Sequence, residues 1–191
     1  MQPEVLDDIS LNYQTRTVGF VRNSLGAITV KDSVNIPLLS KELTLYNRGV
    51  RIIRIGDQAS SKQFLEFFGA PLQTAIGDPS TSGSVLSDTQ TYIVLSYATT
   101  SVTVLGTLYD DGTWNGQIVR IRLRAADSNF SLGTTVHIGM TRDELLMMYP
   151  FADQTNYVLT TTLDDQKYEM TFEFADDAKR TVTGVKLEMI R

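Results

Sequence analysis

A helix start that occurs twice constrains this fold more than any other feature of the sequence. Ser60 is followed three residues later by Gln63, and Thr141 is followed at the same distance by Glu144. Both pairs fit the capping box, in which each of the two side chains accepts a hydrogen bond from the other residue's backbone amide. An Ile–Gly step precedes each pair, and an apolar run follows it. The sequence therefore predicts two short helices of the same design.

The segments that follow the two helices also correspond. Gly69 with Pro71 predicts the end of the first helix, and Pro150 predicts the end of the second. Three strands are expected after each helix, separated by turns rich in Asp and Gly. The expected strands are 91–97, 101–109 and 117–124 in the first half, and 156–163, 167–174 and 181–190 in the second. We expect an α+β fold of two tandem modules, each a short capped helix packed on an antiparallel β-meander.

Alternation along these strands predicts which face of the sheet is buried. Val119, Ile121 and Leu123 alternate with three arginines, and the strands 167–174 and 181–190 alternate in the same way. Successive side chains of a strand point to opposite faces, so one face is expected to be apolar and the other to face water. We expect the two helices to cover the apolar face.

The N-terminal part of the chain differs from the two modules. Segments 13–21 and 27–30 predict a β-hairpin that turns at 23–26, and segments 43–46 and 50–55 predict a second hairpin. We expect these strands to extend the first module, with a small separate β unit as the alternative. We expect three units: an N-terminal extension with extra strands at 1–42, a first module at 43–126 and a second module at 127–191. Residues 76–84 predict a flexible loop within the first module.

Charge and composition exclude several classes of function. The 191 residues carry 22 acidic and 17 basic side chains, and a formal net charge of −5 disfavours general binding to nucleic acid or to anionic membranes. The chain has no Cys and a single His, His137, which excludes thiol chemistry and multi-histidine metal sites. We therefore expect no metal and no cofactor. We also expect no enzyme activity, because an enzyme would need a pocket built around His137.

Three arginines on one strand are the most unusual surface feature. Arg120, Arg122 and Arg124 predict a positive strip in an acidic chain. A solvated sheet face explains such a strip, and so does an anionic partner or the acidic module of a second copy. Arg51 or Arg54 could extend the strip.

Aromatic residues lie near this strip in the predicted strand order. These aromatic residues are Tyr97, Tyr109 and Trp114. Trp114 falls at the tip of a predicted turn, where packing in the core does not readily explain a large aromatic side chain. Arginine and large aromatic residues are enriched at binding hot spots. We therefore select Tyr109 and Trp114, together with the three arginines, as the expected partner-contact residues.

The second helix start also carries a family resemblance. A Gly–Met–Thr step, an acidic third helical residue and an apolar pair occupy residues 138–146. This block resembles the helix start of small bacterial envelope lipoproteins of the SmpA/OmlA type, and the tandem arrangement resembles the family of the β-lactamase inhibitor protein. The resemblance implies an extracytoplasmic, non-enzymatic protein that binds other proteins, often through the sheet face away from its helices.

The first hypothesis is therefore a non-catalytic protein-binding module of the bacterial cell envelope. The alternative is a protein that binds a small anionic ligand through the arginine strip and the crevice between the modules. No signal peptide is expected in residues 1–8, which are polar and acidic, so membrane contact would come only through an anchor sequence that has been removed. The cytoplasm stays open as the other compartment.

Overall fold

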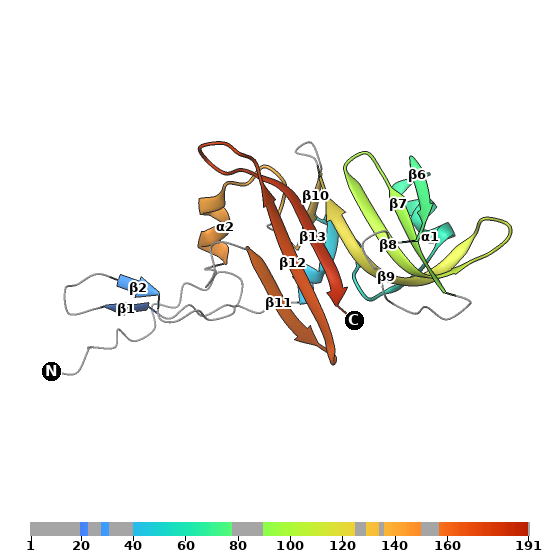
Figure 1. Cartoon of the computed structure of the whole chain (residues 1–191), viewed down its shortest axis with the longest axis horizontal. Coiled ribbons are helices and arrows are strands. Elements are labelled where there is room, and N and C mark those ends of the chain that lie inside the picture. Colours follow the sequence, from blue (N-terminus) through green and yellow to red (C-terminus); the bar gives the residue numbers. More distant parts are fainter. Residues whose placement is uncertain are drawn as a thin grey trace.

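The computed structural model describes residues 20–22, 28–30, 40–77, 90–124, 129–133, 136–149 and 157–190. This part of the chain has two α-helices, one short 3-10 helix and three sheets, and Figure 1 shows how these elements are arranged. The elements in chain order are β1 (Phe20–Arg22), β2 (Ile28–Val30), η1 (Ser40–Leu43), β3 (Thr44–Asn47), β4 (Val50–Arg54), β5 (Gln58–Ser60), α1 (Ser61–Phe68), β6 (Gln73–Ile76), β7 (Thr91–Ser96), β8 (Thr100–Leu108), β9 (Trp114–Leu123), β10 (Phe130–Leu132), α2 (Arg142–Met148), β11 (Val158–Leu163), β12 (Gln166–Phe174) and β13 (Val182–Ile190).

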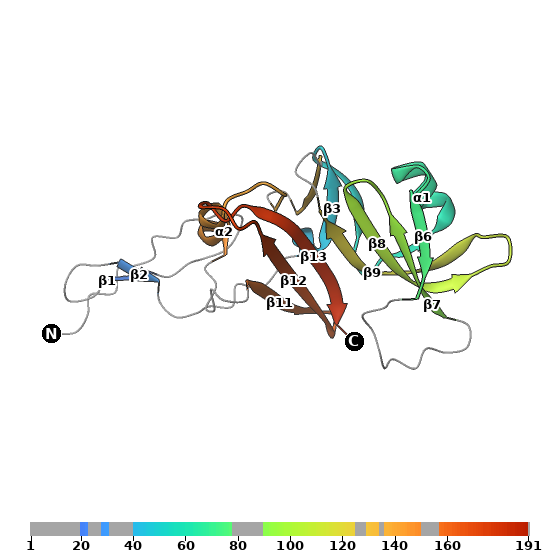
Figure 2. The same cartoon turned by 45° about the horizontal axis from the view of Figure 1, so that its top comes forward.

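The largest element is an antiparallel sheet that runs through both halves of the chain. Its strand order is β11-β12-β13-β9-β8-β7-β6, and β5 pairs with β9 beside this path. Strands β13 and β9 lie side by side where the halves meet (Figure 2). In their register Val185 is opposite Leu123, and Leu187 is opposite Ile121. The expected α+β class is confirmed, because two short helices accompany mostly antiparallel sheets.

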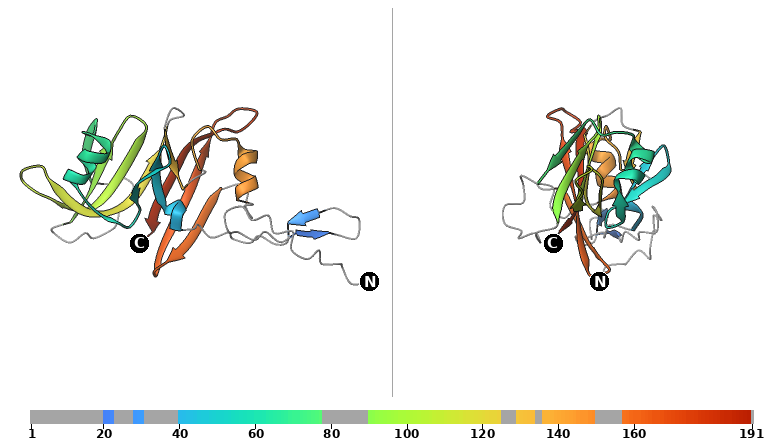
Figure 3. Two further views of the ribbon diagram at one scale, coloured as in Figure 1. Left: turned by 180° about the vertical axis from the view of Figure 1, so that it is seen from behind. Right: turned by 90° about the vertical axis from the view of Figure 1, so that its right-hand side faces the viewer.

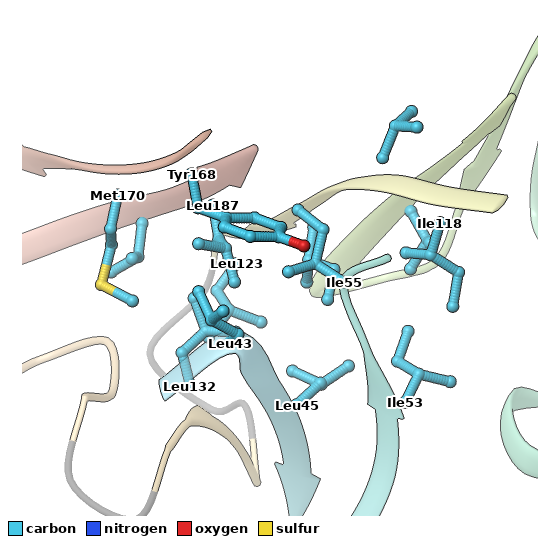
Figure 4. Packing of buried hydrophobic residues seen from close by; sticks show 14 of the residues in the cluster. Leu43, Leu45, Ile53, Ile55, Ile118, Leu123, Leu132, Tyr168, Met170 and Leu187 are labelled. Atoms are coloured by element: carbon cyan, nitrogen blue, oxygen red, sulfur yellow. The ribbon is translucent and has the colours of Figure 1, made fainter. Parts of the chain in front are cut away.

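A second, three-stranded sheet covers the middle of the large one. Its order is β10-β3-β4, so it joins strands from both sides of the expected boundary at residue 126. The helices and this small sheet lie on one side of the large sheet, which we call its inner side (Figure 3). Figure 4 shows the core between the two sheets, where Leu45 and Leu43 point toward Leu123 and Leu187. All four of these leucines have 0% exposure.

Both predicted helix starts are confirmed. The amide of Ser60 donates to Oε1 of Gln63 at 3.0 Å, and the amide of Thr141 donates to Oε2 of Glu144 at 2.7 Å. The reciprocal bonds to the two hydroxyls are also formed, so each helix begins with a complete capping box. Gly69 ends α1 with a positive φ of 72°, a conformation that glycine adopts without steric cost.

Six strands follow the predicted pattern within a few residues, and their turns have the expected chemistry. Strands β7 to β9 form one antiparallel meander, and β11 to β13 form another. Asp164 and Asp165 join β11 to β12 with φ values of 51° and 60°. Positive φ at both central residues matches the right-handed twist of a tight hairpin, and short Asp side chains tolerate it.

Other expectations need correction. The flexible loop predicted to begin at Ile76 begins later, because residues 73–76 form strand β6 and pair with β7 at the edge of the sheet. Residues 78–84 of the predicted loop lie outside the described residues. The hairpin of β3 and β4 is confirmed, but it belongs to the small sheet. Of the first predicted hairpin, the structure describes β1 and β2, which pair antiparallel. The other residues of the predicted hairpin lie outside the described residues.

Candidate binding surface

The open face of the large sheet, which we call its outer face, carries the predicted arginines. Arg120 and Arg122 alternate with Ile121 and Leu123, both of which have 0% exposure on the inner side. Arg124 follows β9 and is exposed at the end of the strand. The predicted division into an apolar face and a polar face is therefore confirmed for this strand.

The arginines of β9 pair with glutamates of the same chain. Nε of Arg120 donates to Oε2 of Glu188 at 3.0 Å, and a guanidinium nitrogen of Arg122 donates to Oε1 of Glu173 at 2.5 Å. Nζ of Lys186 lies 2.5 Å from Oε1 of Glu188. These contacts form two neighbouring groups at the β9–β13 junction, Arg120–Glu188–Lys186 and Arg122–Glu173, and we call the five residues together the seam network. The expected positive strip is thus largely compensated within the molecule.

The register of the strands explains why the network takes this form. Arg122 is directly opposite Lys186, and like charges in that position repel each other. Glu173 relieves this repulsion from the next strand, β12, where it is opposite Gly184. A Cβ atom on Gly184 would lie 3.0 Å from Cδ of Glu173. The glycine therefore leaves the space that the Glu173 side chain needs to reach Arg122.

The seam network is half-buried. The Arg120 side chain is 24% exposed and that of Glu188 is 14% exposed, whereas Glu173 is 50% exposed. Exposed ion pairs contribute about 0–1 kcal/mol, and burial strengthens the attraction while it adds a desolvation cost. Arg120 and Glu188 form the less exposed pair, and this pair is consequently the more firmly positioned part of the surface.

Tyr109 also belongs to the outer face. Its side chain is 46% exposed, and its hydroxyl accepts a 2.7 Å hydrogen bond from Nδ2 of Asn115. Asn115 is on β9 opposite Thr107 of β8. The structure therefore supports an accessible position for Tyr109, at the end of the sheet away from the seam.

The expected exposed position of Trp114 is wrong. Its side chain is only 5% exposed, and its ring meets Phe64 of α1 edge to face with centroids 5.1 Å apart. Strand β9 begins at Trp114 and not at Gln117, so Trp114 shares the inner face with Gly116 and Ile118. The alternation of these three residues with Asn115 and Gln117 was a sequence signal for this placement.

Other residues near the predicted strip also lie elsewhere. Tyr97 stacks on Phe68 of α1 with ring centroids 5.0 Å apart, and burial raises the pKa of its hydroxyl to about 12. Arg51 and Arg54 belong to β4 of the small sheet, where Arg51 pairs with Asp57 at 3.2 Å. The expectation that they extend the arginine strip is wrong, because the two strands belong to different sheets.

An apolar pocket that the sequence did not predict lies beside α1. It has a volume of about 470 Å³ and is bordered by Phe64, Leu65, Leu95, Tyr97 and Trp114. Exposed Leu72, on the segment that leads into β6, adds to the apolar surface near this end of the sheet. Residues from three separate parts of the chain form the pocket, so no local pattern could reveal it.

The described ranges contain no cluster of metal-ligating side chains. His137 is exposed, and no group of three or more His, Cys, Asp or Glu residues in the described ranges could hold a metal ion. Asp111 accepts hydrogen bonds from the amide and hydroxyl of Thr113, at 2.9 and 2.6 Å, which lower the pKa of its carboxyl and close the β8–β9 turn.

None of the described helices is long and apolar enough to cross a membrane.

Comparison with known proteins adds no assignment. No family model, no curated protein and no solved structure matches this chain.

Proposed function

We propose that this protein is a non-catalytic binding module of the bacterial cell envelope that binds another protein through the outer face of its large sheet. The observation that carries the proposal is the seam network, which presents charges of both signs, paired with one another, on the outer face of the sheet. Side chains that are already ordered lose little entropy on binding, and complementary charges give specificity. Tyr109 adds an exposed aromatic contact at the other end of this face.

The pairing of the arginines favours a protein partner over a small anion. Arg120 and Arg122 already have carboxylate partners, so a small anion would have to compete with Glu188 and Glu173. A protein surface can instead offer both charges in a matching arrangement. Arg124, exposed at the end of β9, extends the basic side of this surface.

A tandem architecture is part of the proposal. Each proposed module has a capped helix and a three-stranded antiparallel meander, and the first module has the additional edge strand β6 between them. The last strands of the two modules, β9 and β13, pair with each other. Ile121 and Leu187 face each other near the centre of this pairing, as expected for two copies related by an approximate two-fold axis. The seam network would then form where the two copies of the same strand meet.

A charge exchange tests the binding surface separately from the fold. In the single variant Arg122→Glu, the ion pair is lost and Glu173 is repelled, so both stability and partner binding should fall. In the double variant Arg122→Glu/Glu173→Arg, the pair can form again with reversed signs. We expect the double variant to recover its stability in urea denaturation. We also expect it to bind the protein partner that the wild-type chain captures at least about tenfold more weakly than the wild-type chain does.

Arg51→Glu is the matched control, because it reverses an exposed arginine on the other sheet. Binding by the double variant at the wild-type level would refute recognition through this face. The proposed compartment rests on the sequence resemblance and is tested by fractionating cells that express the native gene. Recovery of the protein in the cytoplasmic fraction alone would contradict it.

A further inference from the structure

A small polar pocket lies on the large sheet away from the seam network. Its volume is about 170 Å³, and it is formed where β5, β9 and β8 lie side by side. The polar side chains that line it are Gln58, Gln90, Thr107, Asn115 and Gln117. Four carboxamides and one hydroxyl therefore surround a space about large enough for one sugar ring.

Close contact between two strands forms part of the pocket wall. Gly106 of β8 is opposite Gly116 of β9. A Cβ atom on Gly116 would lie 2.6 Å from Cα of Gly106, closer than real Cβ contacts allow. The paired glycines let the two strands approach closely, and their backbone forms part of the wall.

Two of the amide side chains are held in place by hydrogen bonds. Nδ2 of Asn115 donates to the hydroxyl of Tyr109 at 2.7 Å, and Nε2 of Gln117 donates to the carbonyl oxygen of Gly56 at 3.0 Å. Gln58 and Gln90 are exposed at the surface. The pocket thus combines positioned groups with groups that can adjust to a ligand.

The chemistry of the lining restricts the class of ligand. Among the residues that the structure describes, no charged side chain lines the pocket, which disfavours phosphates, carboxylates and cations. The described part of the lining also contains no aromatic side chain, whereas bound nucleobases usually stack on aromatic rings. Each carboxamide offers two donors and an acceptor, and each sugar hydroxyl can both donate and accept.

We propose that this pocket binds one ring of a neutral carbohydrate. The carboxamides bond to adjacent hydroxyls of the ring, and Tyr109, joined to the pocket through Asn115, offers an exposed aromatic surface to a neighbouring ring or to the apolar side of the sugar. This site is separate from Arg120, Arg122 and their partners, so sugar binding should survive the charge exchange at the seam.

The test is an NMR titration of the isotope-labelled full chain with glucose, galactose and N-acetylglucosamine, each to about 50 mM, because we expect a dissociation constant on the order of millimolar. The side-chain amide signals of Gln58, Gln90 and Asn115 should shift and saturate with at least one sugar. Loss of one neutral hydrogen bond weakens binding about fivefold, so Gln58→Ala and Gln90→Ala should each show that loss. Gln73→Ala, which removes an exposed glutamine on β6, is the matched control and should bind as the wild type does.

Absence of a saturable shift with all three sugars would overturn the proposal. It would equally be overturned by shifts at other residues only, or by wild-type affinity in both glutamine variants. Saturable binding by the Arg122→Glu/Glu173→Arg variant separates this site from the seam network, and loss of binding in that folded variant would contradict the proposed independence of the pocket from the seam network.

Discussion

Trp114 gives the sharpest test of the packing between α1 and the large sheet. Its side chain is 5% exposed and contacts Phe64 at a centroid distance of 5.1 Å. Replacing a buried Trp by Ala usually costs about 3–5 kcal/mol, of which an aromatic pair supplies about 0.5–1.5 kcal/mol. Trp114 also borders the apolar pocket beside α1, so fewer contacts are lost on that side. We therefore expect Trp114→Ala to cost about 3 kcal/mol, at the lower end of the range.

The assay is urea denaturation followed by circular dichroism, with thermal unfolding as a second measurement. A loss of this size should lower Tm by about 6–12 °C for a chain of this length. Trp114 is the single Trp, so the fluorescence of the wild-type protein reports on it directly and should be blue-shifted and protected from iodide. Tyr109→Ala, at an exposed aromatic residue, is the control and should change stability little. Emission typical of exposed indole, with unchanged stability of Trp114→Ala, would refute the inner placement.

Three further predictions concern helix ends and a buried polar contact. Ser60→Ala and Thr141→Ala should each lower the free energy of unfolding by about 1 kcal/mol in urea denaturation, and unchanged midpoints would contradict the capping boxes. Hydrogen bonds from the amide and hydroxyl of Thr141 lower the pKa of the Glu144 carboxyl in the folded state. The carboxylate therefore stabilises the fold fully above its unfolded-state pKa, and this stabilisation is lost as pH falls through the lower folded-state pKa. A series of urea denaturations between neutral and acidic pH should show a weaker acid dependence for Thr141→Ala, and identical pH profiles would exclude this linkage. Tyr149→Phe should cost about 1–3 kcal/mol, because the buried Glu42 carboxylate loses a 2.7 Å hydrogen bond; equal stability of Tyr149→Phe and wild type would argue against this contact.

The parts of the fold that sequence patterns predicted are those set by local interactions. Each capping box involves residues three apart, and the β-meanders follow from alternation and from turn residues such as Asp164 and Asp165. The physical cause of these elements lies within short segments of chain. For that reason their positions differ from the structure by only a few residues.

The parts that were missed depend on pairing between distant segments. Strand β10 joins β3 in the small sheet, and β13 joins β9 in the large one, in a register that no local pattern specifies. Without that register, Arg122 and Glu173 could not be recognised as partners. Trp114 was misplaced because the expected strand began three residues too late, which moved its side chain from the inner face into a turn.

The most direct test of the proposed function is crosslinking from defined positions in the native host. A photoreactive residue at Ser101, opposite Arg122 on the outer face, should form an adduct with one partner protein. The same residue at Met147, which is 81% exposed on α2, should form no such adduct. Adducts with that partner from Met147 and none from Ser101 would contradict binding through the outer face.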